Sequence, residues 1–168
     1  MFTVEDAIKL ATGAHEGQVD KTGANYIDHP VSVSGLVPLL PSFHELSDEG
    51  RRTAVLAAIL HDVLEDTTET VESLISAGVP EDVVRIVQIL TKNRKEDLGT
   101  YYSRVVADPI SRCVKTADLL HNNLPQRKKG LTDTTAIRLG LKYGVAIPRI
   151  VSKTDEKVFY SIVEEGTG

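Results

Sequence analysis

One stretch of this chain limits its fold more than any other. An apolar run over residues 54–60 passes directly into four ionisable side chains within six positions: His61, Asp62, Glu65 and Asp66. A helix that buries the apolar run brings its polar end close to the protein interior, where a His or a carboxylate needs a metal, a hydrogen bond or a counter-charge. Helical spacing pairs His61 with Glu65, and Asp62 with Asp66. The stretch therefore predicts a buried helix with a chemically active end.

The rest of the chain has the same helical character. Apolar residues recur at helical spacing, and no segment alternates convincingly as a strand does. Helices are predicted over residues 3–14, 30–40, 48–67, 68–77, 80–90, 101–107 and 110–122, and in a last region over 133–163. His29 is expected just before the helix that Pro30 begins, and Pro148 is expected to kink or break the last region. The pattern predicts an all-α bundle.

Length and composition fit one packed domain. The chain has 168 residues, 41% of them hydrophobic and 26% charged, which supports a core and argues against disorder. No internal repeat and no linker divides it. We expect a single helical domain over residues 1–163 and a loose tail over residues 164–168.

Charge, cysteine content and the lack of long apolar runs limit the partners and the compartment expected for this protein. The net charge is −5, whereas proteins that bind duplex nucleic acid usually carry a basic surface, so no duplex nucleic acid partner is expected. Cys113 is the single cysteine, so no internal disulfide forms. The N-terminus lacks a signal-peptide block, and no run approaches the roughly 18 apolar residues of a membrane span. We expect a cytoplasmic protein with no membrane partner, and the oligomeric state stays open.

Four residues from three separate segments have the chemistry of metal ligands. His29 precedes a proline, His61 and Asp62 form the pair described above, and Asp118 follows a mixed apolar and basic run. Two imidazoles and two carboxylates make a nitrogen and oxygen set that suits Mn²⁺, and also Fe²⁺ or another divalent transition metal. Periodicity alone does not decide whether these segments meet in space.

Three ordered motifs carry a family resemblance. They read Tyr-Ile-Asp-His-Pro over residues 26–30, Ile-Leu-His-Asp-Val-Leu-Glu-Asp-Thr over 59–67 and Val-Lys-Thr-Ala-Asp-Leu-Leu-His-Asn over 114–122. In this order the chain resembles the HD-domain hydrolases of the RelA/SpoT type, which include small stand-alone alarmone hydrolases. The resemblance covers roughly residues 7–150 and implies an all-helical HD-domain bundle.

The resemblance also implies an activity and a ligand set. Members of this family bind Mn²⁺, and the matching ligands here are His29, His61, Asp62 and Asp118. The acidic pair that follows the His-Asp motif activates or orients the attacking water, a role that falls to Glu65 and Asp66. The implied reaction removes pyrophosphate from the 3′ position of a (p)ppGpp-like nucleotide, a small-molecule partner.

Three further residues are expected near the substrate. Lys21 matches a family residue close to the nucleotide, and Asn122 matches the asparagine that contacts it. Asp118 and Asn122 are four residues apart, so one helix face could offer both a ligand and a substrate contact. Arg127 follows closely in a basic segment and is the best candidate there for a phosphate contact.

The substrate is less constrained than the reaction. Asp20 stands where the family commonly has an arginine that packs on guanine, and Asn123-Leu124-Pro125 replaces the usual Met-Arg-Thr. The base preference therefore stays open. The alternatives are an HD phosphohydrolase acting on an adenine alarmone, NADPH or a nucleoside phosphate, and a non-catalytic nucleotide sensor.

Overall fold

The fold consists of helices joined by short loops. The computed structural model describes residues 1–21, 23–129 and 131–165, and in these ranges it has no β-strand, only an isolated bridge between Val19 and Asn25. The predicted all-α fold is confirmed. The helices are α1 Val4–Ala14, α2 Asp28–Leu36, the 3₁₀ turn η1 Val37–Leu39, α3 Pro41–His44, α4 Asp48–Leu60, α5 Val63–Asp66, α6 Val71–Ser76, α7 Glu81–Leu90, α8 Leu98–Ala107, α9 Pro109–Asn123, α10 Pro125–Lys128, α11 Asp133–Ile150 and α12 Lys153–Glu165.

Local capping explains where several helices begin. The Thr3 side chain accepts a hydrogen bond from the Asp6 amide, and the Asp6 carboxylate accepts one from the Thr3 amide, which together form a capping box. Ser47 caps α4, and Thr132 caps α11. These caps bind amide groups that have no acceptor within their own helix.

The structure corrects three predicted boundaries. First, α2 begins at Asp28, so His29 lies inside the helix and not before it. Pro30 is tolerated in this first turn because the amides there need no acceptor within the helix. Second, the predicted helix 48–67 is interrupted between α4 and α5. Third, the last region breaks close to Pro148 as expected, but α11 passes through the proline and ends at Ile150, before α12 begins at Lys153.

Part of the predicted C-terminal tail is helical. Residues 164 and 165 of the predicted tail belong to α12, and residues 166–168 lie outside the described residues. No helix in the described part of the chain combines the length and apolar character that a membrane span requires.

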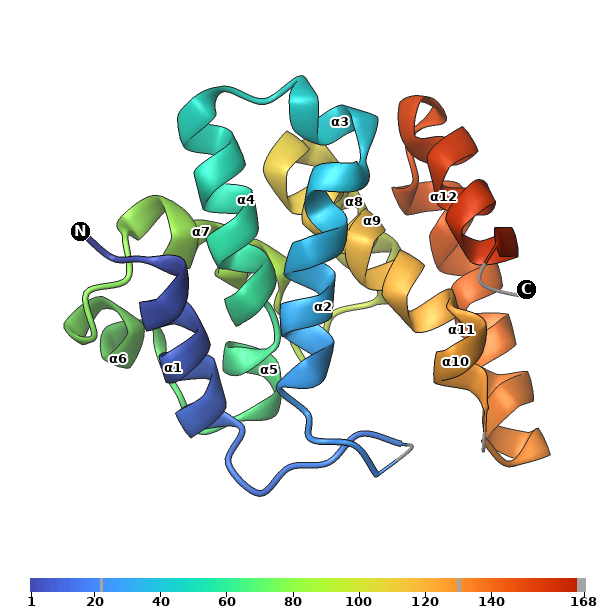
Figure 1. Cartoon of the computed structure of the whole chain (residues 1–168), viewed down its shortest axis with the longest axis horizontal. Coiled ribbons are helices and arrows are strands. Elements are labelled where there is room, and N and C mark those ends of the chain that lie inside the picture. The colour runs from blue at the N-terminus through green and yellow to red at the C-terminus, as the bar shows by residue number, and fades with distance from the viewer. Residues whose placement is uncertain (22, 130, 166–168) are drawn as a thin grey trace.

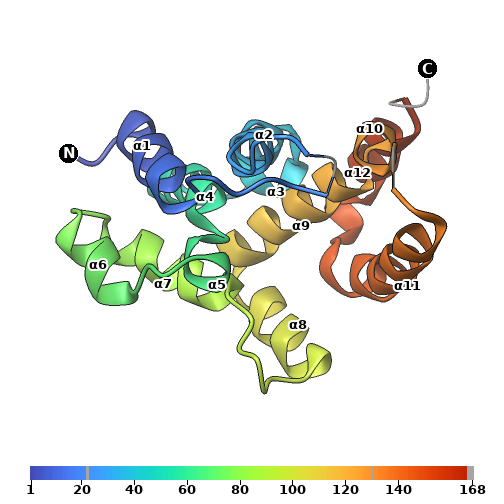
Figure 2. The same ribbon diagram turned by 90° about the horizontal axis from the view of Figure 1, so that it is seen from below.

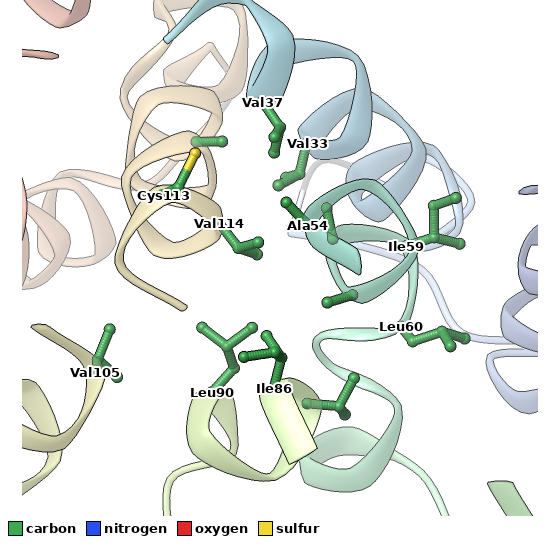
Figure 3. Close-up of a cluster of buried hydrophobic side chains, with 14 of the residues drawn as sticks. Val33, Val37, Ala54, Ile59, Leu60, Ile86, Leu90, Val105, Cys113 and Val114 are labelled. Atoms are coloured by element: carbon green, nitrogen blue, oxygen red, sulfur yellow. The ribbon is translucent and has the colours of Figure 1, made fainter. Parts of the chain in front are cut away.

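Helix α9 runs through the middle of the molecule and packs against α2, α4, α7, α8 and α11 (Figure 1). Its apolar face meets the faces of α2, α4 and α7 in one core, in which side chains from far apart in the sequence point toward one another (Figure 3). Among the labelled side chains of this core are Val33, Val37, Ala54, Ile86, Leu90, Cys113 and Val114. Burial of each such Leu or Ile side chain stabilises the folded state by about 1.5–3 kcal/mol relative to leaving it exposed.

This packing brings separate chain segments to one end of the bundle. The N-terminal half of α2 runs beside α4, and α5 follows directly below the C-terminal end of α4 in Figure 1. Helices α11 and α12 then close the other side. Buried Asp155 fixes α12, because its carboxylate accepts hydrogen bonds from the Ser42 amide at 2.9 Å and the Ser152 hydroxyl at 2.9 Å.

Candidate metal centre

Three elements deliver buried polar side chains to the same point. His29 comes from the first turn of α2, His61 and Asp62 form the break between α4 and α5, and Asp118 lies on α9. His29, His61 and Asp118 are each at most 5% exposed. The apolar side chains beside them in each helix face the core, so the fold holds these polar groups away from bulk water.

The environment of His61 identifies which of its nitrogen atoms is available. Nδ1 lies 2.8 Å from the Ala58 carbonyl oxygen, an arrangement in which Nδ1 carries the proton and donates it. Nε2 is buried and has no hydrogen-bond partner among the described residues. Nε2 faces the Asp62 carboxylate at 3.1 Å, and a metal ion bound between the two groups would satisfy both.

The distances around Nε2 of His61 fit a small cation. This atom lies 3.1 Å from Asp62 Oδ2 and 3.9 Å from Asp118 Oδ1. Nε2 of His29 lies 3.6 Å from Asp62 Oδ2 and 3.2 Å from Asp118 Oδ1. Metal bonds of about 2.0–2.2 Å place neighbouring ligand atoms about 3–3.6 Å apart. One ligand atom each from His29, His61 and Asp62 lie within 4.8 Å of one another, so these residues could hold a divalent metal.

Electrostatics at this point favour a cation. Burial lowers the pKa of His61, but Asp62 and Asp118 outweigh it and raise the pKa to about 9. Burial raises the pKa of Asp62, but His61 and His29 outweigh it and hold that pKa below its usual value. The carboxylate of Asp62 is therefore ionised at neutral pH, and a metal would replace the proton that His61 otherwise carries.

Asp118 is held by two neighbours on its own helix. Its Oδ2 accepts a hydrogen bond from Lys115 Nζ at 2.7 Å, and its Oδ1 accepts one from Asn122 Nδ2 at 2.6 Å. Burial raises the pKa of Asp118, but Lys115 and His29 outweigh it and lower that pKa well below its usual value. Asn122, expected to contact substrate, thus supports Asp118 in this structure.

His121 contacts the candidate ligand His29, a relationship that the sequence analysis missed. Their Nδ1 atoms are 2.7 Å apart. Burial, followed by His29 and Arg127, lowers the pKa of His121 to about 4, so this imidazole is neutral at neutral pH. A neutral His121 can accept the Nδ1 proton of His29, which directs the lone pair of His29 Nε2 toward the carboxylates. Its position three residues after Asp118 on a helix was the available signal.

The acidic pair on α5 lies beside the candidate ligands and is held from outside its own helix. Tyr26 Oη lies 2.7 Å from Asp62 Oδ2 and 3.0 Å from Asp66 Oδ2. Burial, followed by Asp62, raises the pKa of Tyr26, so its hydroxyl stays protonated and donates. Glu65 Oε2 accepts a hydrogen bond from the Lys92 amide at 2.9 Å. Tyr26 was not among the predicted site residues, although it belongs to the first family motif.

The loop before α2 keeps Tyr26 in place. The ring of His15 stacks on the Tyr26 ring, with the centroids 4.6 Å apart. His15 Nδ1 lies 2.9 Å from Gln18 Oε1, and Gln18 Nε2 donates to the Asp66 carbonyl at 2.9 Å. These contacts tie the loop to α5.

The candidate ligands open into a cavity of about 420 Å³. Helices α5 and α11 lie on either side of α9 around it, and α8 completes the wall (Figure 2). Every predicted site residue except His61 lines this cavity: Lys21, His29, Asp62, Glu65, Asp66, Asp118, Asn122 and Arg127. A cavity of this size accommodates a nucleotide-sized ligand.

The predicted substrate residues line the cavity, and Arg127 among them is held in an ion pair. The Arg127 guanidinium forms an ion pair with the Asp20 carboxylate. Asp20 Oδ1 also accepts a hydrogen bond from the Ala24 amide at 3.1 Å. Asp20 therefore joins the loop before α2 to α10 at the edge of the cavity.

Comparison with known proteins places this geometry in a family. The HD domain family matches residues 7–103, a range that contains His29, His61, Asp62 and the acidic pair on α5. A Haemophilus influenzae guanosine-3′,5′-bis(diphosphate) 3′-pyrophosphohydrolase is 28% identical over 91% of this chain and 24% of its own length. A protein of the same name from Aquifex aeolicus is 29% identical over 96% of this chain and 24% of its own length. The chain thus spans about a quarter of the length of these relatives.

A solved structure supports the fold independently. It is described as a metazoan ortholog of SpoT that hydrolyzes ppGpp, and it matches with a TM-score of 0.72 and 20% sequence identity over 97% of this chain and 92% of the other. At this identity the likeness establishes the shared fold. The family match, the relatives and the shared fold confirm the resemblance drawn from the three motifs. The chain belongs to the HD domain family.

Proposed function

We propose that this protein is a metal-dependent nucleotide phosphohydrolase that removes pyrophosphate from the 3′ position of a (p)ppGpp-like nucleotide. The observation that carries the proposal is the buried Nε2 of His61, which makes no hydrogen bond among the described residues and lies 3.1 Å from Asp62 Oδ2 and 3.9 Å from Asp118 Oδ1. Asp62 and Asp118 in turn line a nucleotide-sized cavity. The names of the relatives from Haemophilus influenzae and Aquifex aeolicus support the substrate class.

The proposed ligands are His29, His61, Asp62 and Asp118, and the proposed metal is Mn²⁺. Two imidazoles and two carboxylates suit this ion, and another divalent transition metal is compatible with the same set. When bound, such a metal polarises a phosphoryl oxygen and lowers the pKa of a coordinated water.

The remaining chemistry belongs to the protein's own side chains. Glu65 and Asp66 stand on the cavity wall, where a carboxylate can take or steer the proton of the attacking water. Tyr26 holds Asp66 in position through its hydroxyl group. Lys21, Asn122 and Arg127 would bind the nucleotide.

A hydrolysis screen tests the proposal. Purified protein is incubated with Mn²⁺ and with ppGpp, ppApp, NADPH and common nucleoside phosphates, and the released pyrophosphate and phosphate are resolved. We expect pyrophosphate from a 3′-diphosphate nucleotide, complete loss of turnover after metal chelation, and recovery on adding Mn²⁺.

Two variants locate the activity. Asp62→Ala should abolish both Mn²⁺ binding and turnover, whereas Asp28→Ala, an exposed carboxylate in the same turn as His29, should keep both. Turnover retained by Asp62→Ala would refute the ligand assignment. Nucleotide binding without any metal-dependent turnover would instead favour the alternative that the protein is a non-catalytic nucleotide sensor.

The same screen decides between guanine and other bases. Asp20 lines the cavity and is held in an ion pair with Arg127, so this position offers no cationic group for stacking on guanine. This observation favours the second candidate, the same reaction on a nucleotide with another base. Faster turnover of ppApp than of ppGpp would establish it.

A further inference from the structure

We propose that the outer face of α11 is an interaction surface that pairs with the same face of a second copy of this chain, with the two helices antiparallel and centred on Leu141. The contact is built from residues four apart on α11, which we call the outer row: Asp133, Ile137, Leu141, Val145 and Arg149. The inference goes beyond the proposed hydrolysis and does not depend on it.

The first observation is that the middle of the outer row is apolar and uncovered. Leu141 is 71% exposed and Ile137 is 65% exposed, which makes them, after Met1, the most exposed large apolar side chains in the described part of the chain. Val145, one turn further on, is 48% exposed. Residues four apart are neighbours on a helix surface, so these side chains form one stripe.

This stripe is not the face that the fold itself uses. Tyr143, on the opposite side of α11, is buried and lines the cavity, and the helix packs mainly against α8 and α9. Helix α11 lies at the edge of the molecule (Figures 1 and 2). A surface helix of a monomer normally presents a polar outer face, so an apolar stripe here indicates a contact surface.

The second observation identifies the occupant, because the outer row is complementary to itself. Asp133 lies eight residues before Leu141, and Arg149 lies eight residues after it. A second copy that runs antiparallel and is centred on Leu141 therefore places each Asp133 opposite an Arg149 of the other copy. The same arrangement brings Ile137 and Val145 together between these charges. A two-fold contact requires this kind of self-complementary surface.

Both charges are available for such a contact. Asp133 and Arg149 are exposed, and neither forms an ion pair or a side-chain hydrogen bond among the described residues. They stand at opposite ends of α11, about 24 Å apart along a helix, so they cannot pair within one chain. Charge pairs at the rim of an interface fix its register and orientation.

The third observation is a pair of glycines that the isolated chain does not need. Gly140 and Gly144 are exposed inside α11, and a Cβ at either position would meet no atom within 4 Å. Glycine inside a helix is less favourable than alanine, and no close contact within the chain offsets this. Both glycines flank the outer row, where the absence of a side chain lets a second helix approach closely.

The size of the contact sets the expected affinity. Rows of residues four apart interlock in the commonest class of helix pairs. One helix from each copy buries less than the roughly 1,600 Å² of a standard interface, so we expect a weak dimer with a Kd of about 10–100 µM.

Sedimentation velocity tests for the dimer without nucleotide or metal. Wild type is measured from about 5 to about 500 µM at low salt, and we expect a concentration-dependent dimer. Leu141→Lys places a charge at the centre of the contact and should raise Kd at least about tenfold. The control Ile75→Lys changes a residue that is 50% exposed on α6, at the other end of the molecule in Figures 1 and 2, and should change Kd less than about twofold.

Exchanging the charges tests the antiparallel arrangement. In Asp133→Arg, and equally in Arg149→Asp, like charges meet at both ends of the contact, so each variant alone should have a Kd at least about fivefold higher than wild type. An equimolar mixture of the two variants restores opposite charges at both ends, and its Kd should return to within about twofold of wild type. Mixing cannot repair a helix that is destabilised within one chain, so this recovery reports contact between copies.

Three results would overturn the inference. They are a wild type that stays monomeric at about 500 µM, a dimer with unchanged Kd in Leu141→Lys, and a mixture of the charge variants that dimerises no better than either alone. Thermal unfolding of each variant at low concentration checks the fold. If Leu141→Lys unfolds early, Leu141→Ser replaces it, with an expected rise in Kd of about fivefold. Since no hydrolysis is measured, failure of the proposed function leaves this test unaffected.

Discussion

Nδ1 of His121 lies 2.7 Å from Nδ1 of His29, and this contact determines which nitrogen of His29 faces the candidate ligands. Because His121 is buried and neutral, its Nδ1 can accept the Nδ1 proton of His29, the tautomer that leaves the lone pair of His29 on Nε2. Partners of this kind orient ligand imidazoles in metal sites.

Replacing His121 should therefore weaken metal binding. In His121→Leu the Nδ1 proton of His29 loses its acceptor, and we expect Mn²⁺ affinity to fall about 10- to 100-fold. Calorimetric titration with Mn²⁺ measures it. His44→Leu is the matched control, since the exposed His44 side chain makes its one hydrogen bond among the described residues with the Pro38 carbonyl. Equal affinities in the two variants would exclude this role for His121.

Tyr26→Phe tests the hydroxyl group that links two carboxylates. The variant keeps the ring that stacks on His15 and removes the donor to Asp62 and Asp66. We expect kcat to fall about 10- to 100-fold, because a misplaced catalytic group is costly, with a smaller effect on Mn²⁺ affinity. Tyr160→Phe, exposed on α12, serves as the control. A wild-type kcat in Tyr26→Phe would contradict the prediction.

Arg104 connects the end of α7 to the loop that follows it. Its guanidinium donates to the carbonyls of Gln88, Ile89 and Thr91 and pairs with the Glu96 carboxylate at 2.7 Å. A lysine cannot satisfy this planar set of acceptors. Arg104→Lys should therefore lower the free energy of unfolding by about 1–3 kcal/mol.

The same substitution should also lower the activity, because it loosens a loop that contacts Glu65. The loop that Arg104 holds carries the Lys92 amide, which donates to Glu65. We expect reduced kcat in Arg104→Lys, measured together with urea unfolding. The exposed Arg94→Lys should leave both quantities unchanged, and a fully stable Arg104→Lys would argue against the proposed role of the loop.

Asp108 predicts a pH dependence of stability. Its carboxylate caps α9 through the Ser111 amide and accepts from Arg85 at 2.8 Å. Burial raises its pKa, but these partners outweigh burial and lower it below the usual value. The lowered pKa means that the stabilisation is complete above about pH 4 and is lost as pH falls through the folded-state pKa.

Two variants separate the cap from the charge. Asp108→Ala should cost about 1 kcal/mol or more at neutral pH, because the cap and the ion pair are both lost. Asp108→Asn keeps a cap acceptor and should cost less. In urea unfolding, the difference between wild type and Asp108→Ala should shrink toward about pH 2. A difference that is independent of pH would rule out the lowered pKa.

The predictions that the structure confirms depend on local chemistry. The all-α fold follows from helical periodicity, which depends on residues three and four positions apart. The position of His29 was wrong by a short distance, because the first turn of a helix tolerates proline at more than one position. The interruption at His61 and Asp62 was missed, because the apolar periodicity continues across it.

The sequence by itself determined the helical class, the main caps and the residue types needed for a metal site, because these depend on neighbours in the chain. Only the tertiary structure decided that His29, His61, Asp62 and Asp118 meet, since packing of α2, α4 and α9 sets their distances. It also revealed His121 and Tyr26 as partners of these residues. Their hydrogen bonds join side chains 92 and 36 residues apart, and no local pattern encodes such contacts.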